Sequence, residues 1–165
     1  MRIGMLVAAG MVVVSGCSFS TGSLTVAQDD LEKGVAESVT PDEAGAKVTA
    51  DCAGELEGKV GSEQTCHLDV GEQQADVRLR VTSIKGDEVH WSTQPFLPTD
   101  VIGDSIKSDL DGQGIAVDSV DCQAELVGKV GETTTCATTG AKAPGDLTVE
   151  VTSVDGLLIN FKYTS

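Results

Sequence analysis

The sequence is poor in aromatic and in basic residues. Phe, Trp and Tyr make up only 3% of its 165 residues, so a core must be built mainly from Val, Ile, Leu and Ala. Eleven Lys and Arg stand against 26 Asp and Glu, which gives a formal net charge of −15. Because phosphate binding needs clustered Lys and Arg, we expect no nucleic acid partner. The composition is typical of a solvated acidic coat, and the alternative is a binding surface for a basic partner or for cations.

The sequence also lacks the short motifs of common enzymes and metal sites. It contains no Gly-x-Ser-x-Gly, no phosphate-binding Gly-rich loop and no His-Glu-x-x-His. Asp109-x-Asp111-Gly112 does not continue into a twelve-residue calcium loop. We therefore expect no enzyme activity, no catalytic residues and no cofactor.

Only two histidines are present, His67 and His90, and both fall on the predicted solvent face of the first half of the chain. Asp69, Arg78 and Arg80 are expected on the same face. We expect an ordinary solvated sheet face and no metal site. The alternative is a small polar or metal-binding cluster around the two imidazoles.

The only long apolar run lies near the N-terminus. Met5 to Val14 is too short for a bilayer-spanning helix and has the length of a signal-peptide core. It leads into Val14-Ser15-Gly16-Cys17, which resembles the lipobox of bacterial lipoproteins. The resemblance implies that residues 1–16 are a signal peptide and that Cys17 carries a diacylglycerol, with palmitate as a typical acyl chain. The alternative is an ordinary secreted protein with one odd thiol.

This interpretation predicts where the protein is found. Residues 17–23 would form a lipidated tether, and the six residues Ser18 to Ser23 would span at most about 20 Å. We expect the protein to be anchored by lipid to the cell membrane, on its extracytoplasmic face. A partner would then be an envelope protein or a cell-wall component.

The rest of the chain is one unit written twice. DCAGELEGKVGSEQTC, Asp51 to Cys66, returns seventy residues later as DCQAELVGKVGETTTC, Asp121 to Cys136, and the match continues through 75–93 and 145–163. We therefore predict two small domains, 24–93 and 94–165. Units of about 70 residues bury a small core and usually carry an additional staple.

The cysteines are the expected staple. Five are present, and setting Cys17 aside leaves Cys52, Cys66, Cys122 and Cys136. Four cysteines allow three pairings. We favour Cys52 with Cys66 and Cys122 with Cys136, because each copy is then complete and export is permissive for disulfides. Metal binding is the alternative, but CxxC spacing is missing.

Each unit is predicted to begin with a helix. Thr25 and Gln28 have the spacing of a capping box, and a stripe with Leu31 and Val35 predicts a helix over 26–39. In the second unit Thr99 is the expected cap, and the helical stripe is Ile102, Ile106 and Leu110. The segment 94–98 reads as a short connector.

A period-two pattern follows each helix and predicts about four antiparallel strands. The expected inward residues are Val48, Ala50, Cys52, Cys66, Leu68, Val70, Val77, Leu79, Val81, Val89 and Trp91, then Val120, Cys122, Cys136, Leu147, Val149, Val151, Ile159, Phe161 and Tyr163. Gly86 and Gly156 lie in the expected hairpin turns. The predicted class is α+β, with one N-terminal helix packed on an antiparallel sheet and one internal disulfide in each repeat.

Between the cysteines, Glu55 and Lys59 stand four residues apart, as do Glu125 and Lys129, which predicts a single helical turn. The following Lys-Val-Gly, at 59–61 and 129–131, is expected to be a structural turn that needs the open backbone geometry of glycine. A ligand-binding turn is the alternative.

Cys, Glu-Leu, the Lys-Val-Gly turn, Thr-Cys and a Val-rich strand ending in Val-Thr-Ser together resemble the DUF4333 domain of actinobacterial envelope lipoproteins. The resemblance covers about Val26 to Thr93 and Thr99 to Tyr163. Members often carry Pro after the first Cys, where this chain has Ala53 and Gln123. The resemblance implies a small disulfide-bonded α+β module on a lipoprotein, with no assigned activity and no catalytic residues.

Two classes of function fit these features. The first is a tethered, non-catalytic binding module with an unknown partner. The second is a carrier of a small apolar ligand or lipid, held in a cavity between helix and sheet. A continuous apolar cavity of several hundred Å³ favours the carrier, and a filled core favours the binding module.

Overall fold

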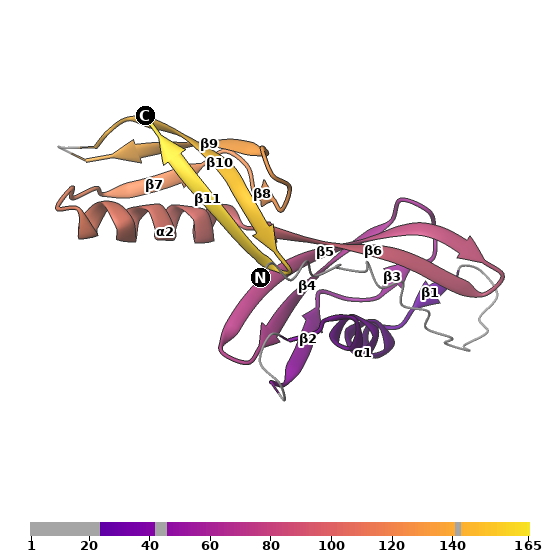
Figure 1. The fold of residues 1–165 in the computed structure, drawn as a ribbon. Coiled ribbons are helices and arrows are strands. Elements are labelled where there is room, and N and C mark those ends of the chain that lie inside the picture. Colours follow the sequence, from indigo (N-terminus) through magenta and orange to yellow (C-terminus); the bar gives the residue numbers. More distant parts are fainter. Residues whose placement is uncertain (1–23, 42–45, 141–142) are drawn as a thin grey trace, which may run out of the picture. The chain divides into compact units, whose positions relative to one another are not determined.

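The computed structural model describes residues 24–41, 46–140 and 143–165. The predicted signal peptide, the tether and Cys17 lie outside the described residues. The elements in chain order are β1 Thr25–Val26, α1 Gln28–Ser38, β2 Val48–Cys52, β3 Leu56–Glu57, β4 Glu63–Val70, β5 Gln73–Lys85, β6 Glu88–Leu97, α2 Thr99–Gly112, β7 Ser119–Cys122, β8 Leu126–Val127, β9 Thr133–Thr139, β10 Asp146–Asp155 and β11 Leu158–Thr164 (Figure 1). The described residues form two helices and antiparallel sheets, in agreement with the predicted α+β class.

The chain divides into two compact units. Unit 1 comprises the chain up to Gln74 together with Leu79–Thr93, and unit 2 comprises Ala75–Arg78 and Gln94–Ser165. Strand β6 therefore begins in unit 1 and ends in unit 2. The predicted connector at 94–98 is wrong for this reason, because its first four residues extend β6.

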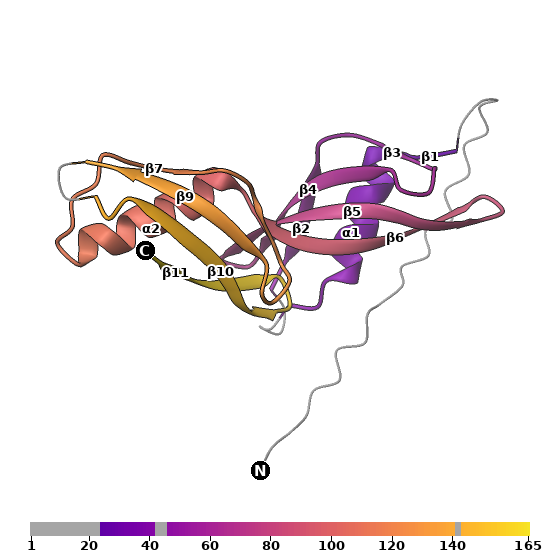
Figure 2. The ribbon, with the colours of Figure 1, turned by 90° about the horizontal axis from the view of Figure 1, so that it is seen from above.

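Unit 2 contains a four-stranded antiparallel sheet in the order β11-β10-β9-β7. Alternate strand residues point to one face, and helix residues at a spacing of four join them in one core. The buried members of this core are Ile102, Ile106, Leu110, Val117, Leu126, Cys136, Leu147, Val149, Val151 and Ile159. Helix α2 runs beside β7 (Figures 1 and 2). A Cβ on Gly103 would lie 2.6 Å from the carbonyl oxygen of Val120, so the close approach requires glycine there.

The first sheet has five strands in the order β2-β4-β5-β6-β8. Four of them come from the first repeat, as predicted. The fifth, β8, pairs only with the unit 2 end of β6, at Phe96 and Leu97. In unit 1, Leu31 and Val35 of the predicted stripe are fully buried, and α1 lies against β2.

Both predicted disulfides are present. Antiparallel pairing places Cys52 of β2 directly opposite Cys66 of β4, and Cys122 of β7 opposite Cys136 of β9. The sulfur atoms are bonded within each repeat. Each disulfide therefore joins two neighbouring strands of one sheet.

The predicted helix caps are wrong. The residues that precede the helices are Ala27 and Pro98, and neither helix has a side-chain cap hydrogen bond. Thr25 instead lies in β1, which pairs with β3 at Leu56 and Glu57. Because Thr25 and Val26 pair with Glu57 and Leu56 in a short ladder, the helix begins only after Ala27, and Thr25 is not at the capping position.

The predicted helical turn between the cysteines is also wrong. Leu56–Glu57 and Leu126–Val127 form the short strands β3 and β8 instead. Each short strand pairs with the segment that directly precedes the helix of its own repeat. Strand β3 pairs with β1, before α1, and β8 pairs with the end of β6, before α2. The hydrophobic side chains Leu56 and Leu126 are fully buried there, which outweighs a local Glu–Lys pair worth a few tenths of a kcal/mol.

Candidate functional site

An open groove lies between α2 and β11 in unit 2. Its volume is about 730 Å³. Its lining residues are Ser105, Ile106, Asp109, Gln113, Ile159, Asn160, Phe161, Lys162 and Tyr163. The helical spacing of four turns Ser105, Asp109 and Gln113 toward the same side of α2. The groove therefore joins one helix stripe to one strand.

The floor of the groove is apolar. Ile106 is fully buried, Ile159 is 7% exposed, and Phe161 is half-buried. Strand alternation places Ile159, Phe161 and Tyr163 on one face of β11. All three belong to the predicted inward set, and the partial exposure of Phe161 and Tyr163 follows from their position on the last strand of the sheet.

Three polar side chains form one wall. The Tyr163 hydroxyl donates a hydrogen bond to Oδ2 of Asp109. The Nε2 of Gln113 donates to the same Asp109 oxygen at 3.1 Å and contacts the Tyr163 hydroxyl oxygen at 3.2 Å. The hydrogen bond to Asp109, together with burial, raises the pKa of Tyr163 above its ordinary value of 10.0. The tyrosine is thus held protonated, and the wall presents the carboxylate of Asp109 with neutral donors around it.

This polar wall belongs to the second repeat. The first repeat has Thr93 at the position aligned with Tyr163, so it lacks the phenol. Sequence reasoning missed the wall, because Asp109 and Tyr163 are 54 residues apart. A usable signal was that the only Tyr of the chain closes the last predicted strand.

The two Lys-Val-Gly segments are turns, as predicted. Ser62 N donates to Lys59 O at 2.9 Å, and Gly61 has φ of 92°, a value that favours glycine. Gly61 N donates to Val81 O and Val81 N donates to Ser62 O, both at 2.9 Å, so the turn is fixed to β5.

The second copy repeats this geometry. Glu132 N bonds to Lys129 O, and Gly131 and Glu132 exchange hydrogen bonds with Val151 of β10. The valines at the two tips are 60% and 63% exposed. These bonds confirm the predicted structural turn, and ligand binding at the turns stays an alternative hypothesis.

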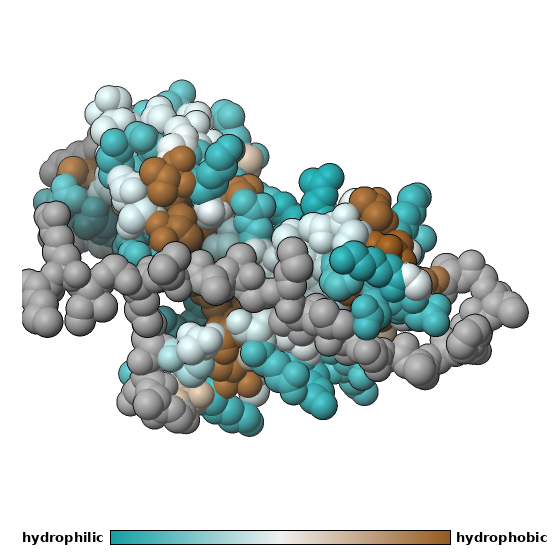
Figure 3. Space-filling view, turned by 45° about the vertical axis from the view of Figure 1, so that its right-hand side comes forward, coloured by the Kyte–Doolittle hydropathy of each residue, from teal (hydrophilic) through white to brown (hydrophobic). Residues whose placement is uncertain are grey.

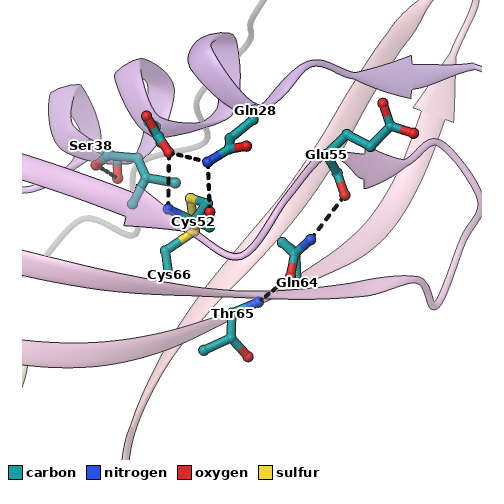
Figure 4. Close-up of a disulfide and its surroundings, with 9 residues drawn as sticks. Gln28, Ser38, Cys52, Glu55, Gln64, Thr65 and Cys66 are labelled. Atoms are coloured by element: carbon teal, nitrogen blue, oxygen red, sulfur yellow. Dashed lines mark hydrogen bonds between the residues drawn. A yellow bond between two sulfur atoms is a disulfide. The ribbon is translucent and has the colours of Figure 1, made fainter.

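The disulfide of unit 1 is linked to α1 by two polar side chains (Figure 4). Gln28 Nε2 donates to Cys52 O at 2.8 Å and to Glu32 Oε1 at 2.9 Å, and Cys52 N donates to the same Glu32 oxygen at 3.0 Å. The hydrogen bond from Cys52 N, then that from Gln28, lowers the pKa of Glu32. Gln28 therefore contacts β2, where the sequence predicted a capping box.

The two histidines considered as a cluster lie on strands that are not neighbours, His67 on β4 and His90 on β6, with β5 between them. His90 is 13% exposed by side chain and lies 4.0 Å from a Glu88 oxygen. His67 lies in β4 opposite Asp51. The side chain of His90 is therefore mostly covered, where the sequence predicted a solvent-facing one.

The other residues expected on that face have separate partners. Asp69 accepts a hydrogen bond from Gln74, and Arg80 pairs with Glu63 at 3.6 Å. Over residues 24–41, 46–140 and 143–165, no group of three or more His, Cys, Asp or Glu side chains has metal-binding geometry. Asp69 and Arg80 therefore each have a partner of their own, Gln74 and Glu63.

Arg78 makes an interaction that the sequence did not indicate. Its guanidinium contacts both carboxylate oxygens of Glu125, at 2.7 and 2.5 Å, and lies 4.9 Å from the ring centroid of Phe96. Side chains of Arg78 and Glu125 are 30% and 32% exposed. This bidentate ion pair joins Arg78 of β5 to Glu125, the residue before β8, and the guanidinium stacks on Phe96 of β6. All three residues belong to unit 2.

A family model described as a domain of unknown function, DUF4333, matches the chain twice, over residues 12–86 and 89–156. The resemblance of the two repeats to this domain is therefore confirmed, with two tandem copies. No curated protein and no solved structure gives a match. Among the described residues, no helix is long and apolar enough to cross a membrane.

Proposed function

We propose, from the premise that this chain belongs to the DUF4333 family, that it is a membrane-tethered, non-catalytic binding module. The groove between α2 and β11 is its binding site. The observation that carries this proposal is an open, partly apolar groove whose wall holds a fixed carboxylate and a protonated phenol. Apolar surface with a few oriented polar groups is what small recognition sites share.

The packing of unit 2 supports a binding module over a carrier. Ile102, Leu126 and Val149 are fully buried beside α2, so the space between helix and sheet is filled by side chains. The hollow found instead is open to solvent and has a polar wall. On the face drawn in Figure 3, apolar side chains form small groups separated by hydrophilic ones, which suits a local contact site.

The proposal includes the finer architecture. Each repeat is one helix packed on the apolar face of one antiparallel sheet. The shared core of α2 with β7, β9, β10 and β11 supports this for unit 2. The buried stripe of α1 beside β2 supports it for unit 1. A disulfide-joined sheet of this kind is a rigid platform on which a groove keeps its shape.

The tether forms part of the same proposal. Cleavage after Gly16 and lipid attachment at Cys17 would leave seven residues, 17–23, before the folded units. A chain of this length keeps the units close to the outer face of the membrane. The partner is then an envelope protein or a cell-wall component.

Photo-crosslinking in cells tests the proposed site. A photoreactive amino acid is placed at Ser105, which is exposed and lines the groove, or at Ser108, which is exposed on the same helix outside the lining. The full chain, with its anchor, is irradiated in intact cells, and crosslinked products are identified by mass spectrometry. We expect a discrete product from Ser105 that is missing from Ser108. Equal patterns from both positions, or no product from Ser105, would exclude the groove as the site.

The anchor is tested separately with Cys17→Ser. We expect the wild-type chain in the membrane fraction with a mass increase from acylation, and the variant without acyl mass. A wild-type Cys17 with a free thiol would contradict the tether.

A further inference from the structure

Strand β11 is a free sheet edge. Over the described residues, β11 pairs with β10 alone and ends the order β11-β10-β9-β7. In an antiparallel ladder, alternate residues of an edge strand point their N–H and C=O groups away from the sheet. The outer side of β11 therefore offers a row of backbone donors and acceptors.

The groove lies beside this edge. Ile159, Phe161 and Tyr163 of β11 line it, so the strand that offers free backbone groups also forms the groove floor and wall. A strand added to β11 would lie about 4.8 Å away, and every second side chain would point toward the groove side of the sheet. Backbone pairing and side-chain insertion can thus occur together, which is the mode of β-strand addition.

The chain shows strand addition next to the corresponding edge of the other repeat. Residues 88–93 of β6 align with 158–163 of β11, and β6 continues past them to Phe96 and Leu97, which pair with Val127 and Leu126 of β8 on the side away from β5. A finishing strand that is extended in this way therefore accepts an antiparallel partner. In β11 the described residues leave that side open.

Charge decides which occupant fits. Of the two charged side chains in the groove, Lys162 pairs with Glu150 at 2.9 Å, whereas Asp109 accepts hydrogen bonds only from neutral Tyr163 and Gln113. Because Glu150 offsets Lys162, the charge left at the groove is that of Asp109, which is negative, on a chain of formal charge −15. A second copy would be repelled, and a basic segment would be attracted.

We propose that the edge of β11 takes an extended peptide segment of a basic partner protein. The segment pairs with the β11 backbone, directs alternate apolar side chains toward Ile159 and Phe161, and places one Lys or Arg against Asp109. This inference rests on the proposed function and names the partner chemistry of the same groove.

Binding of a short peptide to the full chain in neutral phosphatidylcholine nanodiscs tests this. The probe is fluorescein-labelled Thr-Val-Thr-Val-Thr-Lys-Thr-Val-Thr, and the control has Glu in place of Lys. We expect the Lys peptide to bind at least about tenfold tighter than the Glu peptide, since like charges repel. It should also slow amide exchange in 158–164.

Two N-methylated forms of the peptide test the backbone pairing. Methyl groups on alternate residues remove the N–H groups of one edge and keep the side chains. We expect one form to bind at least about tenfold more weakly and the other to bind like the parent, because an added strand uses one edge only. Equal binding of both forms would overturn strand addition, as would unchanged exchange in 158–164 at millimolar peptide.

Protein variants test the charge. Asp109→Asn should weaken the Lys peptide about two- to fivefold, the scale of a partly exposed ion pair. Asp104→Asn, exposed on the same helix outside the groove, should not. Equal effects of the two variants, or a chain that dimerises by light scattering with β11 protected, would overturn the proposal.

The Ser105 crosslink separates the two levels of inference. If the peptide tests fail and the crosslink persists, the groove binds its partner in another way and only the strand proposal is lost. If the crosslink is also missing, the proposed function fails too.

Discussion

Substitution of Gly128 by Ala should destabilise unit 2, although this glycine has no positive φ. A Cβ at this position would lie 2.8 Å from both the carbonyl oxygen and the Cγ of Pro95, and 3.1 Å from Cδ1 of Ile159. That is about 0.6 Å shorter than ordinary van der Waals contact, and one of the obstructing atoms is backbone. The end of β6 must move, and the hydrogen bond from Gly128 N to Pro95 O, 2.8 Å long, is lost or stretched.

The expected cost is about 1–3 kcal/mol, the range for overpacking. Amide exchange by mass spectrometry in the segment 119–164 should then become about 5- to 150-fold faster, since 1.4 kcal/mol is a factor of ten. Gly112→Ala is the matched control in the same unit, because nothing lies within 4 Å of its Cβ position. It should be neutral or stabilise by up to about 1 kcal/mol. Exchange in 119–164 that is the same in Gly128→Ala as in Gly112→Ala would refute the steric reasoning.

Tyr163, Glu32 and the unit 2 disulfide each make a contact whose loss should be measurable. Tyr163, the only Tyr, should titrate above pH 10.0 by absorbance, and Asp109→Asn should lower the pKa of Tyr163. The stabilisation from this hydrogen bond is present below pH 10.0 and is lost as the pH rises through the pKa of the folded protein. Titration of Tyr163 at its ordinary value would contradict the hydrogen bond. The lowered pKa of Glu32 contributes stability that is present above pH 4.5, its ordinary value, and is lost as the pH falls through the pKa of the folded protein. Below pH 4.5, the free energy of urea unfolding should therefore depend less on pH in Glu32→Gln than in Glu37→Gln, an exposed control on α1. Equal pH dependence in the two variants would exclude the assignment to Glu32. Replacing both cysteines of the unit 2 disulfide by Ala should cost about 3 kcal/mol in urea unfolding, from the entropy of a loop of about 15 residues, and a loss below about 1 kcal/mol would show that the loop is already ordered without the bond.

Much of the fold follows from local patterns that the sequence displays twice. Alternation of apolar and polar residues predicted the strands because one face of each sheet is buried, and Leu79, Val81, Val149 and Val151 are indeed fully or almost fully buried. The disulfide pairing was predictable because the two copies have equal cysteine spacing.

The short strands were not predictable. Thr25–Val26 and Leu56–Glu57 are two residues long, so they contain no period that distinguishes a strand from a helical turn. Their pairing depends on where the chain lies before α1, which is tertiary information. The same holds for the end of β6, where Pro95 suggested a connector.

The groove escaped prediction for a similar reason. Phe161 and Tyr163 were assigned to the inward face, and they do lie on it, but the sequence does not say that β11 ends the sheet and leaves them half-covered. The partners of the polar wall and of Arg78 are 54 and 47 residues away along the chain. Such contacts are fixed only when helix and strand have been placed against each other.

The continuity of β6 has a consequence for how such chains can grow. The strand that finishes the first repeat supplies, in Pro95 to Leu97, the lead-in segment that β8 of the next repeat requires. A second repeat expressed from Thr99 onward would lack the β6 residues with which β8 pairs. A further repeat fused behind the last strand of an existing one would receive such residues if that strand were extended. Head-to-tail multiplication of the gene segment is therefore permitted by the geometry, and trimming between copies is penalised.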